Sequence, residues 1–240
     1  AGGTINMAAS NSGAYNINGG AGNDILTGGG GNDIFTVAAA TEADGDTING
    51  GAGTDTINLS TGTHTLNDDA KLSNVETIVA NSSGSTLILT NQAEGFTLTG
   101  GAGTDNFTGG SGADVITGGA GNDTFAGGTG NDTFNIDSGT DTISDLGTGS
   151  DIFVVSSGAT LNATPITSFT ATFASRNDGT ANLTAATGGG VIDLSNVASG
   201  AGSYTITVGA GTDTVTGSSG NDVFVVAATT QGNADTINGG

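Results

Sequence analysis

Aspartate recurs at one fixed place in a glycine-rich pattern along this chain of 240 residues. Seven segments fit Gly-Gly-x-Gly-x-Asp-x-apolar-x without exception, and six more keep the aspartate and the apolar residue. A carboxylate beside a loop whose glycines can turn carbonyls inward offers the hard oxygen ligands that Ca²⁺ prefers. The candidate metal-binding aspartates are Asp24, Asp33, Asp46, Asp55, Asp105, Asp114, Asp123, Asp132, Asp141, Asp151, Asp213, Asp222 and Asp235.

The backbone of the same loops supplies further candidate ligands. Calcium takes about six to eight oxygen ligands, so one carboxylate from each loop does not complete a site. We expect backbone carbonyls at the first and third positions of the complete repeats to contribute. These carbonyls belong to Gly19, Ala21, Gly28, Gly30, Gly50, Ala52, Gly100, Ala102, Gly109, Ser111, Gly118, Ala120, Gly127 and Thr129.

The nine-residue period predicts the elements that position these loops. Six residues form a glycine-rich loop and three form a short strand, in which alternation sends the apolar residue inward. Two repeats make one coil, and stacked coils bring aspartates two repeats apart, such as Asp105 and Asp123, next to each other. The expected fold class is therefore all-β, a parallel β-roll or β-solenoid. The predicted inward residues are Leu26, Phe35, Ile48, Ile57, Phe107, Ile116, Phe125, Phe134, Ile143, Phe153, Val215, Phe224 and Ile237.

The charge of the chain indicates that this arrangement needs a cation. The chain has 23 acidic residues and only two basic ones, Lys71 and Arg176, which gives a formal net charge of −21. Stacked carboxylates repel each other, whereas a divalent ion between them turns the repulsion into a stabilising contact and couples folding to binding. The same charge makes nucleic acid a poor partner, because phosphate binding needs clustered Lys and Arg.

Other features exclude several classes of protein. The chain has no cysteine, so disulfides and thiolate zinc sites are ruled out. No stretch approaches the roughly 20 apolar residues of a membrane span, and we expect no membrane insertion. The only histidine, His64, has no marked nucleophile beside it, and we interpret it as a solvent-facing strand residue. We expect no catalytic residues, so the chain is not predicted to be an enzyme.

The tandem repeats at 100–135, such as GGAGNDTFA at 118–126, resemble the RTX, or haemolysin-type calcium-binding, repeat. The resemblance implies a right-handed parallel β-roll and several calcium ions held by loop aspartates and carbonyls. It also implies type I secretion from a Gram-negative bacterium, with folding outside the cell. The Thr- and Asn-rich stretches between repeats, such as LSNVETI at 72–78, resemble bacterial surface-layer, giant matrix and adhesin proteins.

The repeats divide the chain into segments of different character. We expect repeat-bearing β-roll at 1–58 and 100–154, metal-free solenoid coils at 59–99, and solenoid returning to repeats at 191–240. The remaining segment, 155–190, is a Thr/Ala-rich insertion whose Asn-Asp-Gly signal at 177–179 predicts a protruding hairpin.

The leading functional hypothesis is a secreted, calcium-binding structural protein that folds with calcium and self-assembles into a cell-surface layer or filament. The chain opens and closes inside a glycine motif, so we interpret it as a piece of a longer chain whose uncapped coils could stack end to end. Its main partner would then be another copy of itself. The alternatives are a secretion and folding module of a larger secreted enzyme, or an adhesin segment that contacts cell-surface glycan or lipopolysaccharide.

Overall fold

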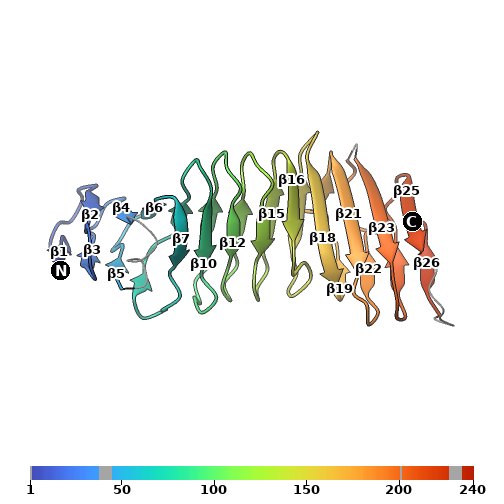
Figure 1. Cartoon of the computed structure of the whole chain (residues 1–240), viewed down its shortest axis with the longest axis horizontal. Helices are drawn as coiled ribbons and strands as arrows, with labels where there is room; N and C mark the ends of the chain where they lie inside the picture. The colour runs from blue at the N-terminus through green and yellow to red at the C-terminus, as the bar shows by residue number, and fades with distance from the viewer. Residues whose placement is uncertain (1, 38–44, 201, 227–233) are drawn as a thin grey trace.

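A computed structural model describes residues 2–37, 45–200, 202–226 and 234–240 of the chain. These residues form strands and no helix, so none of them lies in a helix that could cross a membrane. The strands pair in parallel and wind into an elongated solenoid of about 11 turns, with β1 (Thr4–Asn6) and β26 (Thr236–Asn238) at opposite ends (Figure 1). The predicted all-β parallel roll is confirmed.

The strands lie in four sheets, and the chain changes its pair of sheets twice along the solenoid. We number the sheets I to IV from the N-terminal end of the solenoid. The chain alternates first between sheets I and II, then between II and III, and finally between III and IV. Sheet I contains β1, β3 (Ile25–Thr27), β5 (Thr47–Asn49) and β8 (Leu72–Ser73). Sheet II contains β2 (Asn16–Asn18), β4 (Ile34–Val37), β6 (Thr56–Leu59), β9 (Thr77–Val79), β11 (Thr97–Thr99), β13 (Val115–Thr117), β15 (Thr133–Ile136), β17 (Ile152–Val155) and β20 (Arg176–Asn177).

The other two sheets complete the middle and the C-terminal part of the solenoid. Sheet III contains β7 (Gly62–Thr65), β10 (Ser85–Ile88), β12 (Asn106–Thr108), β14 (Thr124–Ala126), β16 (Thr140–Ile143), β18 (Thr160–Ile166), β21 (Thr180–Ala185), β23 (Ser203–Val208) and β25 (Asp222–Val226). Sheet IV contains β19 (Ser168–Thr170), β22 (Val191–Asp193), β24 (Thr214–Thr216) and β26.

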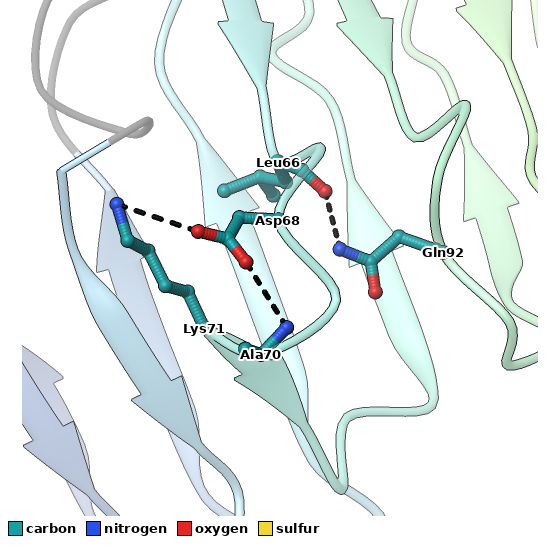
Figure 2. A network of polar contacts seen from close by, with 5 residues as sticks. All are labelled: Leu66, Asp68, Ala70, Lys71 and Gln92. Atoms are coloured by element: carbon teal, nitrogen blue, oxygen red, sulfur yellow. Dashed lines mark hydrogen bonds and ion pairs between the residues drawn. The ribbon is translucent and has the colours of Figure 1, made fainter.

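Both changes of sheet fall in segments without a complete nonapeptide. The successive strands β7, β8 and β9 belong to sheets III, I and II, and β18, β19 and β20 belong to sheets III, IV and II. Side-chain contacts hold the first change together, as Figure 2 shows: Gln92 donates through Nε2 to the carbonyl of Leu66 at 2.6 Å, and Lys71 pairs with Asp68 at 3.7 Å. Longer stretches between repeats thus let the solenoid add a third strand to a coil.

One continuous apolar core runs through the solenoid. The inward position is buried in nearly every strand, and the rings of Phe107, Phe125 and Phe134 follow one another with centroids 6.2 and 6.4 Å apart. Eleven of the thirteen predicted inward residues are buried. The exceptions are Phe224, which is partly buried, and Ile237, which is 41% exposed because no described strand of sheet IV lies beyond β26.

The predicted protruding hairpin at 177–179 is wrong. β20 before this turn pairs in parallel with β17, and β21 after it pairs in parallel with β18 and β23. The turn joins strands of two different sheets, and Asn177 Oδ1 stabilises it by accepting the N–H of Gly179 at 3.0 Å. Because Leu161, Ala163 and Phe169 alternate inward like the rest of the core, this segment forms coils of the solenoid.

His64 is also placed differently from the prediction. It occupies the inward position of β7, level with Leu87 of β10, and is fully buried. Its neighbours Thr63 and Thr65 take the outward positions of the strand, and Nε2 lies 2.9 Å from the carbonyl oxygen of Ser60. Strand alternation therefore makes His64 a core residue.

Candidate metal centres

The predicted aspartates form four columns, one for each sheet, because each lies at or just before the start of a strand. Eleven of them are buried, whereas Asp222 and Asp235 are half-buried. Sheet I carries Asp24 and Asp46, and sheet IV carries Asp213 and Asp235. Sheet II carries Asp33, Asp55, Asp114, Asp132 and Asp151, and sheet III carries Asp105, Asp123, Asp141 and Asp222.

Hydrogen bonds between neighbouring coils link the residues of each column. The N–H of Asp105 donates to Oδ1 of Asp123 at 2.8 Å, and the N–H of Asp123 donates to Oδ1 of Asp141 at 2.9 Å. All the aspartates of the columns except Asp222 accept such a bond from the preceding coil. Loops two repeats apart are thus direct neighbours, as the spacing predicts.

Among the described residues, the second carboxylate oxygen, Oδ2, has no hydrogen-bond partner in about half of these aspartates. In Asp33 and Asp114, for example, Oδ2 accepts the N–H of a loop glycine four residues earlier, at 2.7 and 3.2 Å. In six other aspartates Oδ2 is buried without any partner among the described residues, and burying an unpaired charged oxygen is costly. This group comprises Asp24, Asp55, Asp123, Asp132, Asp141 and Asp213.

The first glycine of the repeat lies where oxygens from two coils converge. A β-carbon on Gly100 would lie 2.1 Å from the carbonyl oxygen of Gly118 and 2.6 Å from Oδ2 of Asp105, so only glycine fits. Within the described residues, no backbone hydrogen bond reaches the first-position carbonyls, whereas the second-position carbonyl of Gly101 accepts the N–H of Ala120 at 2.9 Å. First-position carbonyls are therefore available to a cation.

The third residue of the repeat fixes the loops in register through its N–H group. Ala52, Ala120 and Thr129 donate to second-position glycine carbonyls of the preceding coil at 2.9 to 3.0 Å. These contacts align the loops, and metal ligation by the third-position carbonyls remains a prediction.

Burial makes several of these carboxyl groups resist ionisation. It raises the pKa of Asp132 to about 7 and that of Asp141 to about 6, while backbone N–H groups partly oppose the shift and neighbouring carboxylates add to it. The pKa values of Asp55, Asp114, Asp123 and Asp151 are also raised, mainly by burial. A cation between the loops would remove this penalty and hold the carboxylates ionised.

The donor set fits calcium. It consists of carboxylate and carbonyl oxygens, the hard ligands that calcium takes. The described residues contain no group of three or more His, Cys, Asp or Glu side chains that could hold a metal. Each ion would therefore depend on backbone carbonyls as well as on the aspartates of adjacent loops.

Parallel coils whose glycine loops present columns of buried aspartates define a calcium-binding β-roll. The family model of the RTX calcium-binding nonapeptide repeat matches residues 11–39, 40–63, 99–134, 108–143 and 198–226, more than half of the chain in total. The chain belongs to this family, whose repeats bind multiple calcium ions and occur in secreted bacterial proteins. Comparisons with curated proteins and with solved structures found no match.

Two acidic residues outside the predicted set also lie in these columns or loops. Glu76 stands at the aspartate position of sheet II, where its Oε2 accepts the N–H of Asp55 at 2.8 Å. Asp145 accepts the N–H groups of Gly127 and Gly128 at 3.0 and 2.8 Å. The order carboxylate-x-apolar at 76–78 repeats the motif of the nonapeptide and was the available signal for Glu76.

Calcium binding is expected to weaken as the pH falls from about 8 to about 5, because protons compete for buried carboxylates such as Asp132 and Asp141. Without calcium, the pH dependence of stability has the opposite sign: the fold becomes less stable as the pH rises. A raised carboxyl pKa stabilises the fold below the unfolded value of 3.8, and this contribution is lost as the pH rises through about 6 to 7. Calcium titrations followed by circular dichroism at several pH values measure the first effect, with EDTA samples for the second. A folding midpoint independent of pH would contradict the prediction.

Proposed function

We propose that this chain is a structural segment of an extracellular protein, which folds with calcium after secretion and assembles with further copies through its flat sheet faces into a surface layer or filament. The observation that supports assembly is the distribution of charge. Acidic side chains concentrate in the loops along the edges, whereas the strand residues of sheet II from β4 to β17 include no charged side chain.

The outward face of sheet II is regular and neutral. Thr97 and Thr99 of β11 lie beside Val115 and Thr117 of β13, and Val115 is 39% exposed. Such a face can pack against another sheet at about 10 Å. A net charge of −21 opposes any approach of two copies, and calcium bound in the edge loops would reduce that repulsion. Assembly through this face would therefore depend on calcium.

A lysine at the centre of sheet II tests the proposal. Thr97→Lys is expected to keep the chain folded but monomeric at saturating calcium, because a buried unpaired ammonium is unfavourable between two faces. Thr90→Lys is the matched control, since Thr90 is also exposed but lies in the turn after β10. Sedimentation velocity and negative-stain microscopy would report assembly.

Wild-type chain and the Thr90→Lys control should form large particles with calcium and dissociate in EDTA. Monodisperse wild-type particles at saturating calcium would refute assembly of this segment. That result would favour the alternative role, a secretion and folding module within a larger secreted enzyme, since RTX roll segments are typically non-catalytic.

A further inference from the structure

The aspartate column of sheet II continues into a coil that has no nonapeptide. We propose that Asn74 and Glu76 complete a further calcium site with the loop at 50–55. These two residues lie outside the matched repeats, which end at residue 63 and resume at residue 99. The inference does not depend on the proposed assembly.

Glu76 takes the place of the next aspartate in the column. β9 pairs with β6 so that Thr77 lies level with Thr56 and Ile78 with Ile57, which brings Glu76 level with Asp55. Oε2 of Glu76 accepts the N–H of Asp55 at 2.8 Å, the same contact that Asp132 makes with Asp114 at 2.9 Å. Both the register and the hydrogen bond therefore match those of a nonapeptide site.

Asn74 takes the place of the first glycine. A β-carbon on Gly50 would lie 1.8 Å from the carbonyl oxygen of Asn74, just as one on Gly100 would lie 2.1 Å from that of Gly118. Among the described residues, Asn74 is the one non-glycine residue with a positive φ, 51°, a conformation that asparagine tolerates better than most residues. The first-position glycines have no positive φ, so it is the contact with Gly50 that places the Asn74 carbonyl where a first-position glycine carbonyl lies.

The turn from Asn74 to Glu76 replaces a longer loop. It is three residues shorter than the segment from Gly50 to Asp55. Nδ2 of Asn74 donates to Oδ1 of Asn49 at 2.9 Å, which ties the short turn to the preceding coil.

The proposed site contains an unpartnered buried oxygen. Asp55 is only 1% exposed, and its Oδ2 has no hydrogen-bond partner among the described residues. This oxygen lies 2.4 Å from the position of a β-carbon on Gly50, the same point that lies 1.8 Å from the Asn74 carbonyl oxygen. Two electron-rich oxygens thus converge on one point at Gly50, in a loop that the Glu76 carboxylate also contacts through the Asp55 N–H, and a calcium ion would satisfy all three groups.

Calcium stoichiometry measured by equilibrium dialysis with radioactive calcium tests the proposal. Glu76→Gln keeps an oxygen that can accept the Asp55 N–H but removes the charge, and it should bind one calcium ion fewer than the wild type. Glu94→Gln is the matched control, because Glu94 is also exposed, lies in the next coil before β11 and is not level with an aspartate. Asn74→Gly keeps both the carbonyl and the left-handed conformation, and it should retain the full count.

Crystals of the wild-type chain grown in calcium give a test that does not depend on a variant folding. Anomalous difference density is expected between Asp55, Asn74 and Glu76, in addition to peaks at the nonapeptide loops. Peaks at the nonapeptide loops alone, or an unchanged calcium count in folded Glu76→Gln, would overturn the inference. Either result would leave calcium binding by the repeats and the proposed assembly untouched.

Discussion

Calcium added to the calcium-free chain is expected to convert a largely disordered polypeptide into β-structure in one cooperative transition. The core is thin, because each strand contributes only its few inward side chains, and it must hold together columns of buried carboxylates in a chain of net charge −21. Without a cation, repulsion and desolvation oppose folding, whereas calcium binding supplies folding free energy directly. Far-UV circular dichroism during a calcium titration measures this transition.

Magnesium is the control for this titration. It is smaller, prefers octahedral geometry and gives up water reluctantly, so loops built from carbonyls and single carboxylates should not fold around it. Extracellular calcium modules bind with dissociation constants of about 10⁻⁴ to 10⁻³ M, and we expect the midpoint in this range. A complete β signal in EDTA would show that the aspartate columns are not needed for folding.

Replacing Asp132 with asparagine is expected to have opposite effects with and without calcium. In EDTA at about pH 8 the variant should contain more β-structure, because the buried carboxylate beside Asp114, Asp145 and Asp151 is gone. One pKa unit corresponds to about 1.4 kcal/mol, so the gain should be on the order of a few kcal/mol. With calcium, the variant should need roughly tenfold more ion to fold, because it lacks one ligand charge.

Asp137→Asn is the matched control for this pair of measurements. Asp137 is exposed in the loop after β15, and its replacement removes the same charge while every column aspartate stays in place, although the Asp137 charge adds slightly to the raised pKa of Asp141. Calcium titration and the β signal in EDTA should both change much less than in Asp132→Asn. Destabilisation of Asp132→Asn under both conditions would show that the negative charge of Asp132 stabilises the fold without calcium, since asparagine keeps the oxygen that accepts the Asp114 N–H.

The nonapeptide spacing predicted the fold well because its period couples loop, strand and core. The residue two positions after each aspartate had to point inward, and Phe107, Phe125 and Phe134 do so. The same spacing placed Asp105 beside Asp123, and the hydrogen bond between them follows from that register.

The sequence could not predict how coils without the repeat would be arranged. The turn signal at 177–179 is compatible with a hairpin or with a corner between two sheets. Only the structure decides between them, because β20 pairs in parallel with β17 and β21 pairs in parallel with β18. The residue type of His64 favours an exposed position, whereas strand alternation in β7 places it in the core. The position of the Asn74 carbonyl beside the sheet II column depends on the positive φ of Asn74, and this backbone conformation cannot be predicted from the sequence.

The hydrogen bonds of the aspartate columns give the solenoid a direction. In each hydrogen-bonded pair of a column, the backbone N–H belongs to the earlier coil and the carboxylate to the later one, as with Asp114 and Asp132. Removing a coil from the C-terminal side therefore leaves an N–H of the coil before it without its acceptor. Removing one from the N-terminal side leaves only a carboxylate oxygen, which water or an ion readily satisfies. Truncation should thus be better tolerated from the N-terminal side. A folding nucleus near the C-terminal end would offer carboxylate acceptors to each coil that precedes it in the sequence and packs onto it.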